Sequence, residues 1–220
     1  MIGINDDVTH TSLDYGAEFD CMPPGTKQCV FWGFGTDGTV GANKQAIKTI
    51  GTQTPLWGQG HFAYDSHKGG GVTMSHLRFG PEPIKGEYEI QTNADYIACH
   101  NSTYVHKFNM LKPIKEGGTF VLNWGWGEDQ LDARLPNKMK EQIAANNLNF
   151  YTIDASKIAL EAGLGQRVNM VLQAVFYHLS EVLPAEEAMD ILKQDIEKTY
   201  GKKGPKIVQM NKDCVDQAIT

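Results

Sequence analysis

A G-x-G-x-x-G motif, Gly33-Phe34-Gly35-Thr36-Asp37-Gly38, lies between two segments of different periodicity and constrains the fold more than any other feature. Residues 29–32 before it form a short apolar run, which is typical of a buried strand. Apolar residues after it, between positions 39 and 50, recur at roughly helical spacing. The sequence therefore predicts a strand, a tight turn and a helix in this order.

Such a turn can bind a diphosphate. Glycines let the backbone approach a ligand closely, and the free N–H groups at a helix start, with the helix dipole, attract anions. Thr36 and Thr39 would add hydroxyl donors. The alternative is that the glycines only make a tight turn, with Asp37 capping the helix. A diphosphate would require the Asp37 carboxylate to point away into such a cap, because like charges repel.

The remaining pattern alternates strands with helices. Strands are predicted at residues 61–64, 72–79, 96–99, 119–122 and 150–153, and helices near residues 101–111, 138–145, 172–179 and 188–200. This order favours an α/β fold, a three-layer α/β/α arrangement with a mostly parallel sheet. The two strands that flank the glycines at residues 69–71 would pair antiparallel and make the sheet mixed.

The chain divides by composition near residue 26. Residues 1–26 are acidic and end in Met-Pro-Pro-Gly-Thr, which is linker chemistry. The folded unit is expected at residues 27–220. The polar start and the absence of a Gly or Pro stop at the end suggest a piece of a longer chain.

Charge and composition exclude several classes of function. A net charge of -6 argues against a nucleic-acid or anionic-membrane surface. Neither a signal sequence nor a membrane-length apolar run is present, so a cytoplasmic protein is expected, or one of an anaerobic organelle. The four cysteines lack C-x-x-C spacing and the seven histidines lack ligand spacing, so no metal is assigned.

Lys68, in a loop rich in glycine, is the best candidate for a cation that closes on a phosphate, although a solvated surface lysine is the commoner case. His76 and Arg78 on the next strand could face the same cleft or solvent. Trp124 and Trp126 could stack on an adenine, but packing is favoured for both.

Five stretches, in order, closely resemble the gamma-type domain of single-chain pyruvate:ferredoxin or flavodoxin oxidoreductases. They are FWGFGTDGTVGANKQAIKTIG, YDSHKGGGVTMSHLRFG, ADYIACHN, IKEGGTFVLNW and YGKKGPKIVQMN. The resemblance implies an enzyme that oxidatively decarboxylates pyruvate to acetyl-CoA and passes electrons to ferredoxin or flavodoxin. Thiamine diphosphate, Mg and [4Fe-4S] clusters would lie in other domains of a homodimer, which fits the absence of their motifs here.

In this family the gamma-type domain contacts coenzyme A, and the resemblance implies the same contacts here. The matching positions are Thr36, Asp37, Gly38, Thr39, Val40, Lys68, Asn169 and Asn211. No residue pattern alone would select Asn169, which could cap a helix, or Asn211, which looks like an exposed amide. The fragment itself is expected to be inactive.

Two other functions remain open from the sequence. One is an NAD(P)-type dinucleotide-binding domain with Asp65 on the ribose, although Asp65 lies farther from Gly38 than the roughly 20 residues expected. The other is a purely structural interdomain module that binds no nucleotide.

Overall fold

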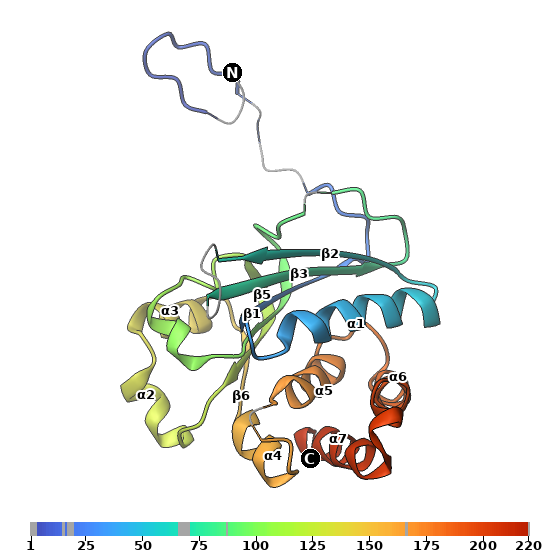
Figure 1. The fold of residues 1–220 in the computed structure, drawn as a ribbon. Coiled ribbons are helices and arrows are strands. Elements are labelled where there is room, and N and C mark those ends of the chain that lie inside the picture. The colour runs from blue at the N-terminus through green and yellow to red at the C-terminus, as the bar shows by residue number, and fades with distance from the viewer. Residues whose placement is uncertain are drawn as a thin grey trace.

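A six-stranded sheet forms the centre of the computed structural model, which describes residues 4–14, 16, 20–65, 71–86, 88–165 and 167–219 (Figure 1). The strands are β1 (Lys27–Phe34), β2 (Trp57–Tyr64), β3 (Val72–Gly80), β4 (Ala94–Cys99), β5 (Ile114–Asn123) and β6 (Asn149–Ile153). Their spatial order is β2-β3-β1-β4-β5-β6.

The sheet is mixed. The strands β1, β4, β5 and β6 pair with one another in parallel, whereas β3 is antiparallel to both β1 and β2. This confirms the prediction of a mostly parallel sheet with an antiparallel pair. Consecutive strands such as β2 and β3 can pair antiparallel through a short connection, whereas parallel neighbours need a crossover.

Helices cover both faces of the sheet. They are α1 (Thr39–Gln53), α2 (Leu131–Arg134), α3 (Asn137–Ala145), α4 (Ala155–Glu161), α5 (Asn169–Leu179), α6 (Ala185–Tyr200) and α7 (Pro205–Ala218). Short 3-10 helices occur as η1 (Ser102–His106), η2 (Glu128–Gln130) and η3 (Gly201–Lys203). Helices α1 and α5 lie on one face, with α6 and α7 packed against α5 (Figure 1).

Alternate residues of the central strand point into two separate cores. Cys29 and Phe31 of β1 belong to the core beneath α1 and α5, while Val30 belongs to the core on the other face, with residues of η1 and α3. This follows from the two-residue period of a strand. The predicted α/β fold with a layer on each face is confirmed.

An aromatic cluster joins α5 to the sheet. Phe176 of α5 is 1% exposed, and its ring centroid lies 5.1 Å from that of Phe31 and 5.5 Å from that of Tyr96. The ring centroid of Phe79 of β3 lies 6.2 Å from that of Phe176. Edge-to-face aromatic contacts at these distances add to the free energy gained from burial.

The helix predicted near residues 101–111 is wrong in length and type. Only η1 forms, and the chain then turns so that Met110 and Leu111 are both almost completely buried against the second core. Its predicted start is right, because the Asn101 side chain accepts a hydrogen bond from the Thr103 amide. The helical spacing of the apolar residues did not produce an α-helix, because the short connection between β4 and β5 buries adjacent apolar side chains in a more compact turn.

The N-terminal part of the chain lies outside this layered body. Residues 4–14 lie apart from the sheet and helices (Figure 1). The first strand begins at Lys27. Division of the chain at residue 26 stays a prediction.

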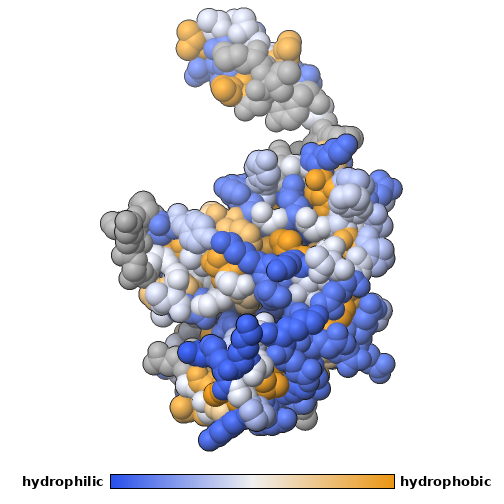
Figure 2. Space-filling model, turned by 45° about the vertical axis from the view of Figure 1, so that its right-hand side comes forward, coloured by the Kyte–Doolittle hydropathy of each residue, from blue (hydrophilic) through white to orange (hydrophobic). Residues whose placement is uncertain are grey.

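On the face drawn in Figure 2, hydrophilic residues dominate the lower part of the body and hydrophobic residues form small, separate patches. Within the described ranges, no helix is long and apolar enough to cross a membrane. That face offers no extended apolar area.

We expect the substitution Phe176→Ala to lower the free energy of unfolding by about 3–5 kcal/mol, because it leaves a cavity at the centre of the aromatic cluster. Urea denaturation followed by circular dichroism measures the change. Leu160→Ala, at a side chain that is 68% exposed, is the control and should change stability by no more than about 0.5 kcal/mol. Similar losses of unfolding free energy in both variants would contradict the proposal that the aromatic cluster stabilises the fold.

Candidate functional site

The glycine motif makes the tight strand-to-helix turn that the sequence predicts. Gly38 directly precedes α1 with φ +86°, a conformation that glycine adopts without strain. At Gly33, an added Cβ atom would lie 2.7 Å from Cβ of Thr39, so a larger residue does not fit. Two of the glycines are therefore required by the turn itself.

Asp37 closes this turn through the backbone. Its Oδ2 accepts a hydrogen bond from the Phe34 amide and its Oδ1 accepts one from the Thr39 amide, both at 2.8 Å. The carboxylate is thus used as the backbone cap that a nearby anion would require. Two amide dipoles offset its charge and reduce its repulsion of a phosphate.

The threonines of the motif have different surroundings. Thr36 is exposed, whereas Thr39 is buried, with its hydroxyl 2.6 Å from Nδ1 of His100. The Thr39 hydroxyl is therefore bonded within the protein, and its contact with a ligand stays a prediction. Val40 is half-buried in the first turn of α1, where the amides of Val40 and Gly41 have no acceptor within the helix.

His100, which follows β4, ties the turn to the next strand. Burial lowers its pKa from 6.5 to about 4, and the nearby Asp37 carboxylate acts in the opposite direction. The imidazole is therefore neutral at pH 7. Its Nε2 is buried and has no hydrogen-bond partner among the residues that the structure describes.

Asn169 lies directly against the glycine turn. A Cβ atom added to Gly38 would be 3.2 Å from Cγ of Asn169. Asn169 is the first residue of α5, which is preceded by Val168 as the cap residue, so the alternative that Asn169 caps the helix is wrong. The structure thus brings together two predicted site residues that are far apart in sequence.

Asn211 differs from the sequence expectation. It is only 3% exposed in α7 and donates a hydrogen bond from Nδ2 to the Ile207 carbonyl at 2.7 Å. The description of an exposed amide is wrong, because α7 packs this face against α5 and α6. Lys68 lies outside the described residues.

The side chains of His76 and Arg78 on β3 form hydrogen bonds within the protein and do not face the glycine turn. Arg78 is buried and donates to Oε1 of Gln28 and Oε1 of Gln59, each at 2.8 Å, and to backbone carbonyls of the segment that follows β3. Nδ1 of His76 accepts from the Ile90 amide. Both residues hold that segment in place. Trp124 is buried in the second core, as packing predicts. Trp126 makes an edge contact with Trp124 but is 41% exposed, so the prediction that it is packed in a core is wrong.

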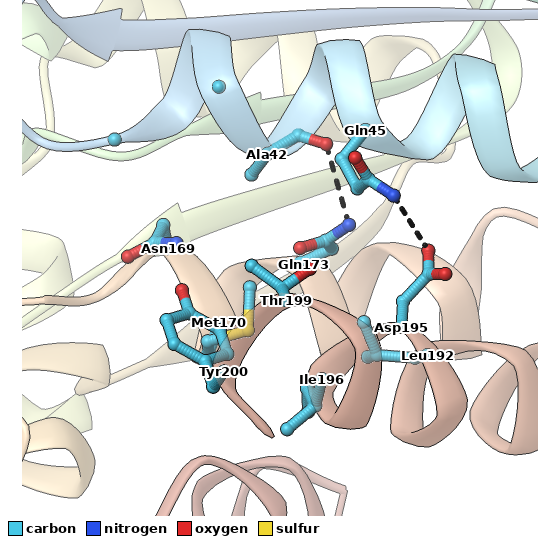
Figure 3. A pocket seen from close by; sticks show the side chains of 12 residues that line it. Ala42, Gln45, Asn169, Met170, Gln173, Leu192, Asp195, Ile196, Thr199 and Tyr200 are labelled. Carbon is cyan, nitrogen blue, oxygen red and sulfur yellow. Dashed lines mark hydrogen bonds between the residues drawn. The ribbon is translucent and has the colours of Figure 1, made fainter. Parts of the chain in front are cut away.

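Two hollows flank the turn. A pocket of about 240 Å³ lies between α1, α5 and α6, and its wall includes Gly38, Asn169, Gln45, Gln173 and Asp195 (Figure 3). A more open hollow of about 560 Å³ lies at the carboxyl ends of β1, β4 and β5, beside Asp37 and His100. No sequence motif marks Gln45, Gln173 or Asp195, because their positions depend on helix packing. No motif marks His100 either, because its position depends on the pairing of β4 with β1.

The turn stands where the strand order changes direction. From β1 the chain passes through α1 towards β2, whereas from β4 it passes to β5 on the opposite side. Ligands of open α/β sheets bind in the crevice outside the carboxyl ends of the strands at such a point. The dinucleotide alternative fits less well, because the antiparallel β3 separates β2, which Asp65 follows, from β1. Within the described ranges, no group of three or more His, Cys, Asp or Glu could hold a metal ion.

Comparison with known protein families and sequences gives consistent matches. A family model described as pyruvate ferredoxin/flavodoxin oxidoreductase matches residues 28–220. A pyruvate:ferredoxin oxidoreductase from Moorella thermoacetica is 53% identical over 99% of this chain and 18% of its own length. The chain spans less than a fifth of the length of such curated relatives.

Solved structures share the fold. A pyruvate oxidoreductase subunit from Thermotoga maritima has a TM-score of 0.68 and 14% identity, over 88% of this chain and 95% of that one. A 2-oxoglutarate:ferredoxin oxidoreductase from Magnetococcus marinus, with 2-oxoglutarate, coenzyme A and succinyl-CoA bound, has a TM-score of 0.66 and 20% identity, over 90% of this chain and 31% of that one. At these identities the likeness concerns the fold.

We expect Gly38→Ala to destabilise the protein by about 1–2 kcal/mol, since alanine is strained at positive φ and its Cβ would press on Asn169. Gly41→Ala is the matched control, in the first turn of α1 with open space around it. It should stabilise the helix by up to about 1 kcal/mol. Thermal unfolding of both variants checks the opposite signs, and two changes of the same sign would contradict this account.

Stability should also depend on pH through His100. Its folded pKa of about 4 lies below the ordinary 6.5, so the unfolded chain binds the proton more tightly. The contribution of neutral His100 to the free energy of unfolding should be complete above about pH 6.5 and should fall by about 3 kcal/mol as the pH decreases to 4. Urea denaturation at several pH values gives the free energy of unfolding as a function of pH. This free energy should fall less steeply with decreasing pH in His100→Gln than in the unmodified protein. An equal pH dependence in both proteins would rule out the lowered pKa of His100.

Proposed function

The chain belongs to the pyruvate ferredoxin/flavodoxin oxidoreductase family, and on this premise we propose that it is the part of such an enzyme that binds coenzyme A. The complete enzyme would oxidatively decarboxylate pyruvate to acetyl-CoA, with ferredoxin or flavodoxin as the electron acceptor. Thiamine diphosphate, Mg and [4Fe-4S] clusters would be held by other domains. This chain would supply the binding surface for the acyl acceptor.

One observation carries the proposal: Asn169 lies against Gly38 in the strand-to-helix turn. These residues come from α5 and from the start of α1, and they meet at the wall of the 240 Å³ pocket. A ligand that contacts Gly38 from this pocket would therefore lie beside the Asn169 side chain. The Magnetococcus marinus relative of this fold was solved with coenzyme A bound, which supports the same class of ligand here.

The turn provides some of the groups that a phosphate requires, namely backbone amides and the helix dipole, but no cation. The first-turn amides of α1 and the positive end of its dipole attract an anion. The Asp37 carboxylate is occupied by two backbone amides. Among the described residues that line the smaller pocket there is no lysine or arginine. A cation from elsewhere is required for the full charge of the ligand, and Lys68 remains the proposed source.

The NAD(P) alternative is weakened by the strand order, and no observation favours it. The purely structural alternative makes a separate prediction, that no nucleotide changes the melting temperature of the chain. A ligand that binds only the folded state must raise that temperature. Thermal unfolding with coenzyme A, NAD and NADP therefore separates the three functions.

We expect Asn169→Ala in the complete enzyme to raise the KM for coenzyme A by about tenfold and to leave the KM for pyruvate unchanged, because one hydrogen bond to the ligand is lost. Lys68→Ala should act in the same direction. Steady-state kinetics with each substrate varied in turn gives both constants.

Asn137→Ala provides the matched control, because Asn137 is also the first residue of a helix and is exposed on α3. It should change neither constant. Equal effects of Asn169→Ala on the two substrates would contradict the assignment of Asn169 to the coenzyme site.

A further inference from the structure

Residues 4–14, the N-terminal loop, fold on themselves although they lie apart from the sheet and helices (Figure 1). The Asp6 carboxylate is the centre of this loop. It accepts hydrogen bonds from the backbone amides of Val8, Thr9 and Thr11 at 3.1 to 3.2 Å. It also accepts hydrogen bonds from the hydroxyls of both threonines. A carboxylate with several local donors fixes the path of the backbone around it.

The hydroxyl of Ser12 joins the end of the loop to its start. It accepts a hydrogen bond from the Asp6 amide and donates one to the Ile4 carbonyl, both at 2.7 Å. Hydrogen bonds, first of all the one from the Thr9 hydroxyl, lower the pKa of Asp6, so its carboxylate is ionised at neutral pH. The loop thus has a defined shape before any partner is present. A preformed loop loses little conformational entropy when it binds.

This preformed loop exposes large apolar side chains. The exposed fractions of Ile4, Val8 and Leu13 are 63%, 82% and 61%. Hydrophobic residues are visible on the projecting segment in Figure 2. None of the three belongs to the apolar clusters that the described residues form. A single exposed apolar residue is ordinary, but three on one short loop without a core form a surface suited to burial.

The charge of the segment indicates the chemistry of its partner. Residues 1–26 include several acidic residues but neither lysine nor arginine. Asp7, next to the centre of the loop, is exposed and forms no ion pair with another described residue. Contacting surfaces carry complementary charges. The partner surface should therefore be an apolar socket with lysine or arginine at its rim.

The length of the relatives indicates where this socket lies. The chain covers 18% of the Moorella thermoacetica enzyme and 19% of a pyruvate-flavodoxin oxidoreductase from Enterobacter agglomerans. Most of such a polypeptide is therefore available as a partner. The described part of this chain does not cover the loop, since the hydrogen bonds of residues 4–14 within it end between positions 4 and 16. Covalent connection gives a neighbouring domain a high effective concentration, so a small contact suffices.

We infer that the N-terminal loop docks Ile4, Val8 and Leu13 into an apolar socket with a basic rim on another domain of the same polypeptide. Asp6 gives the loop its shape and makes no contact with the socket. Docking would hold this domain in a fixed position relative to its neighbour. The inference goes beyond the proposed function, because it depends on membership of the family and not on the binding of coenzyme A.

Hydrogen exchange of the complete enzyme, read by mass spectrometry, tests the docking. The backbone amides of Val8, Thr9 and Thr11 should exchange at least about 100-fold more slowly than in an unstructured peptide, because burial of the apolar side chains opposes opening. Leu13→Ser removes apolar contact but leaves the hydrogen bonds to Asp6 intact. It should reduce the protection by about tenfold or more, whereas a loop that only closes on itself would keep its exchange rates.

Asp6→Ala and Asp7→Ala form a matched pair, because they remove adjacent carboxylates of which the first holds the loop together. Asp6→Ala should also reduce the protection by about tenfold or more. Asp7→Ala should reduce it by less than about fivefold, the contribution of an exposed ion pair. The loop lies apart from both cores, so all three variants should fold.

A photo-cross-linking residue in place of Asp7 identifies the partner in the complete enzyme. Attachment to a part of the same polypeptide outside these 220 residues is the expected result. Attachment to residues 27–220, or to a second copy in a mixture of isotopically labelled and unlabelled enzyme, would overturn the assignment of the socket. Absence of protection in the unmodified enzyme, or protection that persists in Leu13→Ser, would overturn the docking itself.

Discussion

The strand-to-helix turn after β1 depends on one carboxylate. Asp37 holds the amide of Phe34, at the end of the strand, and the amide of Thr39, at the start of the helix, so it fixes the angle between β1 and α1. Thr39 then contacts His100 after β4, and Gly38 contacts Asn169 at the start of α5. Four elements therefore meet at this turn, whose backbone is fixed by hydrogen bonds within the protein.

The same arrangement explains how an acidic chain could bind an anionic ligand. The overall charge of -6 gives no long-range attraction for phosphate. Local backbone dipoles at the start of α1 act over a short range instead, and the one carboxylate in the motif is already hydrogen-bonded. A chain that spans less than a fifth of its curated relatives need not contain every group that such a ligand requires. Additional contacts from other domains are consistent with a site that lies open on its own.

Sequence reasoning was accurate where local rules determine structure. The glycine motif predicted the turn, the helical spacing predicted α1, and Asn101 was identified as a cap. It failed for the segment after Asn101, where the spacing of Tyr104, Val105 and Leu111 also suits a short crossover that buries them without an α-helix. It also failed for Asn211, whose burial depends on the packing of α7 against two other helices.

By itself the sequence determined the order of the six strands, the glycine turn and the family, because these depend on local backbone preferences and on residues in fixed order. It did not predict the helices α2, α4 and α7. Only the tertiary structure decided which residues meet. It placed Asn169 against Gly38 and the Asp195 carboxylate beside Gln45, although no spacing or motif relates the members of either pair. The physical reason is that helices α5 and α6 are positioned by burial in the common core, which acts between residues that are distant in the chain.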